Sequence, residues 1–329
     1  MSSFTRVLAR RHAPRHGSIQ NVVRTPAAFA VLAFLTSCAT GAAVTDTRVV
    51  VAPVEREQLP SESAAEPVVT IETEPDEREE YRDARQTVFL LTRESSYFGD
   101  GSLDTYRTIV YGETGIEKLE QTLFSADGNV IERRDYTTRV DHTAGERVTE
   151  ERVLDARGAV VTTWIRRYDT DGRLLDETQR DADGELQMRS SYAYGERGLL
   201  SKLEVYSSFA GAMGSTVFVY DGALRIRAES LGPNGALEEL FLYEHDTDGR
   251  MVRRTHSTAN GRVLGRVEYT YAGDLIVRET SYRPNGSTLR SVEYEYDDAG
   301  NAVVERHFDT NGSLRETVRR EFVAREIGD

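Results

Sequence analysis

Three acidic turns carry the side chains best suited to binding a metal ion. In each turn one aspartate stands three residues before a glycine and a second stands directly before it. The pairs are Asp169 and Asp171, Asp181 and Asp183, and Asp246 and Asp248. A calcium loop usually supplies oxygen ligands at its first, third and fifth positions and a glutamate further on. These turns supply only two carboxylates before the glycine, and aspartate in a turn commonly bonds its own backbone. The spacing therefore favours turn chemistry, with calcium binding as the weaker alternative.

Histidines and nucleophiles give no pattern that indicates catalysis. Beyond residue 37 the histidines are His142, His245, His256 and His307, and none has a second His or Cys at metal-ligand spacing. His245 stands where other repeats carry a tyrosine, so it is interpreted as a substituted aromatic residue. No G-x-S-x-G motif is present, and we expect the acidic residues on turns and outward faces rather than paired in a cleft. The sequence thus predicts no catalytic, metal or cofactor site, and no enzyme.

Cys38 is the one cysteine of the chain, and its surroundings predict a lipid anchor. Five arginines and no acidic residue occupy residues 1–25, and the apolar run PAAFAVLAFL follows at 26–35. A basic region followed by a short apolar run is typical of a secretory signal. The residues LTSC at 35–38 resemble the bacterial lipobox, so we expect a signal peptide at 1–37, lipidation of Cys38, and the outer membrane as destination. An ordinary signal with a chance cysteine is the alternative.

Residues 38–86 are predicted to form a disordered acidic linker. From residue 39 they hold twelve Asp or Glu, five Arg and four Pro, a composition that cannot bury enough apolar surface to offset its ordering entropy. The whole chain carries a net charge of -14, and removal of the five arginines of the signal leaves about -19. Such a charge disfavours nucleic acid as a partner.

Glycines recur at a fixed spacing through the rest of the chain. Seventeen of them lie from Gly101 to Gly312, which are 211 positions apart, so the mean interval is about 13 residues. Most follow Asp or Asn, and Asn-Gly and Asp-Gly are strong hairpin signals. Between the glycines, apolar and polar residues alternate with the period of a strand. Residues 87–323 are therefore predicted to be strand-and-turn repeats, followed by a tail at 324–329.

Paired aromatics precede many of the turns. Residues 294–301, YEYDDAGN, match the core Y-x-Y-D-x-x-G, and residues 167–174, RYDTDGRL, match Y-D-x-x-G-R-L. On these motifs the chain resembles the YD repeats of the RHS family, whose large members build β shells around a toxin. The resemblance implies antiparallel strand geometry. With about eight modules the chain looks too short to close a shell, so no enclosing role is expected.

The tyrosine pairs themselves are interpreted as core. Tyr192 and Tyr194, Tyr269 and Tyr271, and Tyr294 and Tyr296 recur at matching places in the repeats. Cross-strand aromatic pairs stabilise sheets. A tyrosine-lined face that stacks on sugar rings is the alternative.

One turn differs from its relatives. Residues 209–214, FAGAMG, are apolar where other turns are acidic. A degenerate repeat explains this, and the alternative is that Phe209 and Met213 contact a partner or a second subunit.

These observations together predict an all-β fold, an elongated antiparallel β-meander forming a twisted or curled open sheet. The charged residues Arg319, Arg320, Glu321 and Arg325 are expected to interrupt pairing at its last edge. The expected function is a non-enzymatic, membrane-anchored envelope lipoprotein that binds a protein or glycan partner on the envelope or a host surface. A structural spacer or assembly component in the periplasm is the alternative.

Overall fold

The structure is a computed structural model that describes residues 47–49, 86–113, 115–141 and 143–327. The chain divides into two units, and every described residue belongs to the second, Asp46–Asp329. Its strands are β1 (Thr47–Val49), β2 (Gln86–Phe98), β3 (Leu103–Tyr111), β4 (Lys118–Ser125), β5 (Val130–Asp141), β6 (Glu146–Asp155), β7 (Val160–Tyr168), β8 (Leu174–Asp181), β9 (Leu186–Tyr194), β10 (Leu200–Ser207), β11 (Gly211–Asp221), β12 (Leu224–Leu231), β13 (Leu237–His245), β14 (Met251–Thr258), β15 (Val263–Ala272), β16 (Leu275–Tyr282), β17 (Thr288–Tyr296), β18 (Ala302–Phe308) and β19 (Leu314–Ile327). Within the described residues, no helix is long and apolar enough to cross a membrane.

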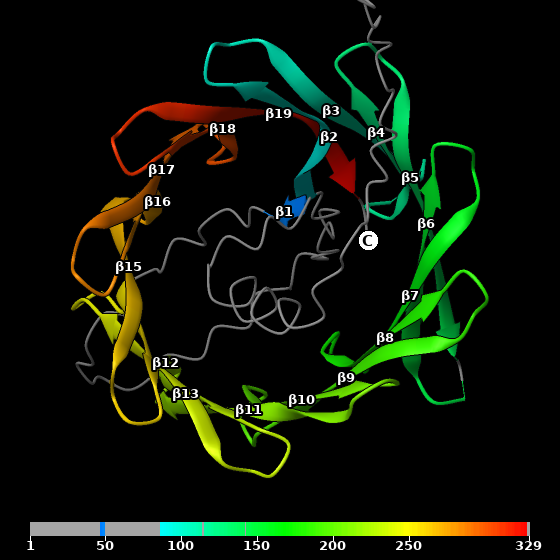
Figure 1. The fold of residues 1–329 in the computed structure, drawn as a ribbon. Helices are drawn as coiled ribbons and strands as arrows, with labels where there is room; N and C mark the ends of the chain where they lie inside the picture. Colours follow the sequence, from blue (N-terminus) through cyan, green and yellow to red (C-terminus); the bar gives the residue numbers. More distant parts are fainter. Residues whose placement is uncertain (1–46, 50–85, 114, 142, 328–329) are drawn as a thin grey trace, which may run out of the picture. The chain divides into compact units, whose positions relative to one another are not determined.

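Strands β2 to β19 close into a barrel of 18 antiparallel strands (Figure 1). Each strand pairs with the next along the chain, and β19 pairs with β2 from Glu316 opposite Phe98 to Ile327 opposite Gln86. The prediction of an open meander is therefore wrong. The expectation that charged residues near the C-terminal end interrupt strand pairing is also wrong. These residues lie within β19, which continues to pair with β2 as far as Ile327: Arg319, Arg320, Glu321 and Arg325.

Bulges beside the turns help to explain the closure. A register shift stands next to most of the hairpin turns, for example between Arg167 and Tyr168 in β7. An extra residue on one strand increases the local twist and bends the ribbon. The short repeats are thus curved strongly enough for eighteen strands to bring the last edge back to the first, where closure removes both unpaired edges.

The repeated turn follows directly from the glycine spacing. The N–H of Gly172 donates to the carbonyl of Asp169 over 3.0 Å, and the N–H of Asp169 donates to the carbonyl of Arg173 over 2.9 Å. Gly172 has φ of +78°, in the left-handed region that glycine adopts without a Cβ penalty. The same arrangement recurs around the barrel, which confirms the predicted strand-and-turn repeat.

One face of the sheet is much more buried than the other. The opposed residues Tyr269, Glu279 and Val292 on β15, β16 and β17 are all buried. Tyr269 confirms the interpretation of the first tyrosine of that pair as core. Val88, Leu90 and Leu91 of β2, beside the seam with β19, are almost completely buried.

Strand β1 adds a short pairing to the same seam. It runs antiparallel to β2, with Thr47 opposite Leu90 and Val49 opposite Val88. This strand falls inside the segment that the sequence predicts to be a linker.

Candidate functional site

Each acidic turn is a compact hydrogen-bonded unit. Oδ1 of Asp169 accepts hydrogen bonds from the N–H groups of Asp171 and Arg173 at 3.0 and 2.8 Å, and its Oδ2 accepts one from Arg173 Nε at 2.7 Å. Asp246 and Arg250 repeat this arrangement. The hydrogen bonds from Arg250 hold the pKa of Asp246 below its usual range. Since both oxygens of the first aspartate are engaged within the turn, the interpretation as turn chemistry is confirmed.

The arginine of the turn also meets the second tyrosine of a pair. The guanidinium of Arg173 lies 5.5 Å from the ring centre of Tyr194, and the hydroxyl of Tyr194 donates to the carbonyl of Leu174 over 2.8 Å. The same bond to the carbonyl 20 residues upstream joins Tyr111 to Leu91, Tyr220 to Leu200, Tyr271 to Met251 and Tyr296 to Ile276. These five tyrosines thus fasten the end of their own strand to the strand before it, which is a structural role.

His245 occupies the place of this second tyrosine. It lies opposite Met251 beside a bulge, as Tyr296 lies opposite Ala302. The interpretation as a substituted aromatic residue is therefore confirmed.

Two other histidines lie on the buried face. The ring of His256 stacks on Phe241 with centres 4.3 Å apart, and Nε2 of His307 lies 2.8 Å from Oε1 of Glu305. His142 is outside the described residues. Across the part of the chain that is described, no group of three His, Cys, Asp or Glu side chains could hold a metal ion.

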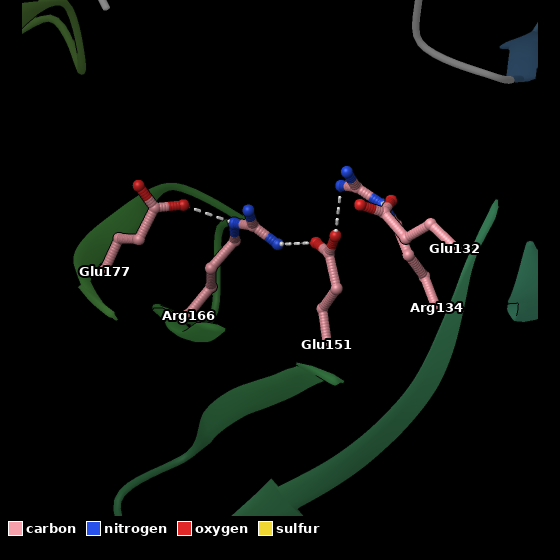
Figure 2. Close-up of polar contacts among 5 residues, drawn as sticks. All are labelled: Glu132, Arg134, Glu151, Arg166 and Glu177. Atoms are coloured by element: carbon pink, nitrogen blue, oxygen red, sulfur yellow. Dashed lines mark hydrogen bonds and ion pairs between the residues drawn. The ribbon is translucent and has the colours of Figure 1, made fainter. Parts of the chain in front are cut away.

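Four charged side chains form a row along the buried face, which we call the inner charged row: Arg134, Glu151, Arg166 and Glu177. Arg134 Nη1 lies 2.7 Å from Glu151 Oε1, Arg166 Nη1 lies 2.8 Å from Glu151 Oε2, and Arg166 Nε lies 2.5 Å from Glu177 Oε2. These residues come from β5, β6, β7 and β8 in turn, and Figure 2 shows their side chains together on one side of the strands. Because the sheet is closed, the face on which side chains are most buried is the one turned toward the enclosed space.

Burial and charge act together in this row. Burial alone would raise the pKa of Glu151, but hydrogen bonds and charge from Arg166 and Arg134 outweigh it, so the pKa lies below its ordinary value. Burial raises the pKa of Tyr136, directly opposite Glu151. Burial also lowers the pKa of Lys118, whose ammonium lies 5.0 Å from the ring centre of Tyr136. The row is thus a charge-compensated part of the interior wall.

A second row spans the closure of the barrel. Arg320 of β19 binds Glu94 of β2 through Nε at 2.7 Å and Glu305 of β18 through Nη2 at 2.8 Å. Arg107 of β3 lies 2.7 Å from Glu94. Ion pairs therefore connect four successive strands across the seam.

Sequence reasoning missed both rows. The expectation that acidic residues lie only on turns and outward faces is wrong, because Glu151, Glu177 and Glu305 line the interior. The available signal was their spacing: Glu151 alternates with Val153, so the two residues share a face.

A hollow opens on the outward face of the sheet beside the turn between β10 and β11. Its volume is about 640 Å³, and its lining includes Arg189, Lys202, Glu204, Tyr206 and Pro233. Lys202 pairs with Glu204 at 2.6 Å. The hollow thus offers aromatic and charged groups on an otherwise strongly charged surface.

The two residues singled out in the apolar turn lie beside this hollow. Phe209, at the tip, is 87% exposed, whereas Met213 on β11 is half-buried. Gly214 next to it belongs to the hollow's lining. The turn therefore has one highly exposed apolar side chain, Phe209, and one that is half-buried, Met213.

Cys38, the predicted lipid-attachment residue, lies outside the described residues. So do the predicted signal peptide and almost all of the predicted linker. These remain predictions from the sequence.

Comparison with known proteins gives only remote similarities. No protein-family model and no curated protein matches the chain. Among solved structures, a porin-like protein from Bacteroides uniformis is similar over 74% of this chain and 94% of its own, with 11% identity and a TM-score of 0.35. The Tc holotoxin pore of Photorhabdus luminescens is similar over 72% of this chain, with 17% identity and a TM-score of 0.24, but this chain spans only 15% of its length. These values are too low to transfer a ligand or an activity.

Proposed function

We propose that the protein is a non-enzymatic lipoprotein of the bacterial cell envelope that binds a partner through the turn between β10 and β11. One observation carries the proposal: Phe209 is 87% exposed at the tip of that turn, beside a hollow of about 640 Å³. Aromatic side chains offered beside a hollow are typical anchors of protein interfaces. A protein partner of the envelope or of a neighbouring cell surface fits this chemistry best, and a glycan is the second possibility.

The charged side chains on the outward face of the barrel support the proposal that this face contacts water and not lipid. Arg253 lies 3.2 Å from Glu268, and Arg306 lies 2.5 Å from Glu295, so cross-strand ion pairs lie on this face. Charged side chains are costly against lipid. The proposal therefore has the barrel in aqueous space, tethered by a lipid at Cys38 through the acidic segment that follows it.

The alternative role, a spacer in the periplasm, was based on an elongated ribbon. The sheet is a closed barrel, so a spacer or assembly component would present a barrel and not a ribbon. Protease treatment of intact and permeabilised cells separates the two settings. Cleavage on intact cells fits a surface binder, and protection until permeabilisation fits a periplasmic one.

The contact itself is tested with a photo-crosslinking amino acid at position 209 and, as control, at Val161, an exposed apolar residue on β7. We expect one recurrent adduct from position 209, absent from position 161 and reduced when purified wild-type protein competes. The variant Phe209→Ser with Met213→Ser should not compete. Equal adducts from both positions, or none from position 209, would contradict the proposal.

The tether has its own test. Cys38→Ser should release the protein from the membrane fraction into the soluble fraction. Continued membrane association of this variant would exclude the lipid anchor.

A further inference from the structure

Three neighbouring side chains on the enclosed face combine charge, a hydroxyl and a carboxyl. Arg254 lies on β14, Tyr269 on β15 and Glu279 on β16, and they are 8%, 6% and 6% exposed. Tyr269 is directly opposite Glu279, and Arg254 is opposite Val267, two residues before Tyr269. The three groups therefore form one patch of the interior wall.

These groups lack the partners that buried polar groups normally have. The hydroxyl of Tyr269 is buried and makes no hydrogen bond. Among the described residues, Arg254 and Glu279 take part in none of the side-chain hydrogen bonds or ion pairs, whereas Arg166 and Arg320 on the same face are each held by two carboxylates. The buried Tyr269 hydroxyl, beside two charged groups without an ion-pair partner in the described part of the chain, calls for an explanation, and a bound solute is one that fits.

Electrostatics shows that the three groups act on one another. Burial raises the pKa of Tyr269 to about 12, and the charge of Arg254 opposes this shift. Burial also raises the pKa of Glu279, and the charges of Arg290 and then Arg254 oppose the shift. One guanidinium thus influences both neighbours without being neutralised by either in an ion pair.

We propose that Arg254, Tyr269 and Glu279 form a binding site, on the interior wall of the barrel, for the oxyanion of a small solute, either a carboxylate or a phosphate. A guanidinium can hold two oxygens of such a group at once. The hydroxyl of Tyr269 supplies one further donor. Burial raises the pKa of Glu279, which favours the neutral carboxyl that tolerates an anion beside it. An oxyanion therefore accepts from Arg254 and Tyr269 and also neutralises the charge of Arg254, which a neutral or cationic solute cannot do. This site is separate from the turn that carries Phe209, so neither proposal depends on the other.

Binding is measured by titration calorimetry on the purified mature protein, with inorganic phosphate, galacturonate and neutral galactose as probes. We expect saturable binding of at least one of the two anions and none of galactose, and the two anion arms identify which source of oxyanion the site prefers. Arg254→Gln should weaken binding at least tenfold. Tyr269→Phe, which removes one donor and keeps the ring, should weaken it about fivefold.

Arg278→Gln is the matched control, because Arg278 lies on the outward face of β16 and is half-exposed. It should bind the anion as the wild type does. Circular dichroism of each variant checks that the barrel is folded, and Tyr269→Phe serves if Arg254→Gln does not fold. The proposal is overturned if neither anion binds at 50 mM, a concentration of the order that weak anion sites require, or if Tyr269→Phe and Arg278→Gln bind equally well.

Discussion

Arg320 and Glu94 form an ion pair across the two ends of the sheet, with Nε and Oε2 2.7 Å apart although 226 residues separate them in the chain. Arg320 is 7% exposed on its side chain and also holds Glu305 at 2.8 Å. In this buried setting each charge depends on its partner, because neither can recover its hydration. The pair therefore stabilises the closed barrel specifically, since an open sheet would separate its members.

Arg320→Met should destabilise the protein strongly because it removes the buried cation that Glu94 and Glu305 share, and leaves only Arg107 beside Glu94 and His307 beside Glu305. We expect a loss of about 3 kcal/mol in the free energy of unfolding, measured by urea denaturation. Arg278→Met is the control, since its guanidinium lies 3.6 Å from Glu293 and both side chains are exposed. The control should change stability by less than about 1 kcal/mol. Equal losses in the two variants would show that the seam pair has no special role.

Tyr296→Phe should cost about 1 kcal/mol, because it removes the hydrogen bond from the hydroxyl to the carbonyl of Ile276 while keeping the ring. Tyr168→Phe is the matched control at the equivalent end of β7. Its ring lies 4.3 Å from the guanidinium of Arg147, a contact that phenylalanine retains. Thermal unfolding of both variants gives the comparison, and a larger loss for Tyr168→Phe would contradict the role assigned to the repeated tyrosine.

Gly214→Ala should be far more damaging than Gly235→Ala. A Cβ at position 214 would lie 2.2 Å from the carbonyl oxygen of Leu231, and φ there is +123°. At Gly235, φ is +77° and nothing lies within 4 Å of the added atom. We expect about 1 kcal/mol for Gly235→Ala from backbone strain alone, and about 3 kcal/mol or more for Gly214→Ala. Chemical denaturation measures both, and similar costs would contradict the close approach at Gly214.

The buried carboxyl of Glu279 should make stability depend on pH. Burial raises its pKa, the charges of Arg290, Arg254 and His307 oppose the shift, and Glu305 adds to it. The folded protein therefore keeps this proton at pH values where the unfolded chain has lost it. The resulting contribution is complete below the unfolded pKa, about 4.3, and is lost as the pH rises through the folded pKa.

Glu279→Gln removes this titration, so its stability relative to the wild type should increase as the pH rises from 4 to 8. Denaturation midpoints at several pH values measure the trend. Glu293→Gln, on the outward face of β17, controls for the loss of one negative charge. A constant difference between Glu279→Gln and the wild type across this range would contradict the raised pKa.

Local features of this fold were predictable from the sequence because they depend on neighbouring residues. Gly172 needs its positive φ for the turn that it ends, and Asp169 caps that same turn. The alternation of apolar and polar residues likewise predicts strands without reference to the rest of the chain. The all-β class and the repeat were therefore accessible.

Closure and the lining of the interior were not predictable in this way. Pairing of β2 with β19 depends on the summed curvature of all the intervening hairpins, and no single repeat encodes it. In the sequence, Glu151 resembles any other charged residue on a strand. Its burial is offset energetically by ion pairs with Arg134 and Arg166 on the adjacent strands, which lie 17 and 15 residues away in the chain. Phe209 was recognised because its turn departs from the acidic pattern, whereas the cluster around Arg254 has no sequence signature.

A disulfide across the seam tests the closed barrel most directly. In a Cys38→Ser background, Ser96→Cys and Val318→Cys place two thiols on directly opposite residues of β2 and β19, within the Cα separation of about 4.5 to 5.5 Å that a disulfide accepts. Mild oxidation should give rapid, nearly complete crosslinking, seen by mass spectrometry of the joined peptides. Ser96→Cys with Val292→Cys, three strands from β2 on β17, should not crosslink. Failure of the 96 and 318 pair to form a disulfide in the folded protein would contradict closure and return the fold to an open sheet.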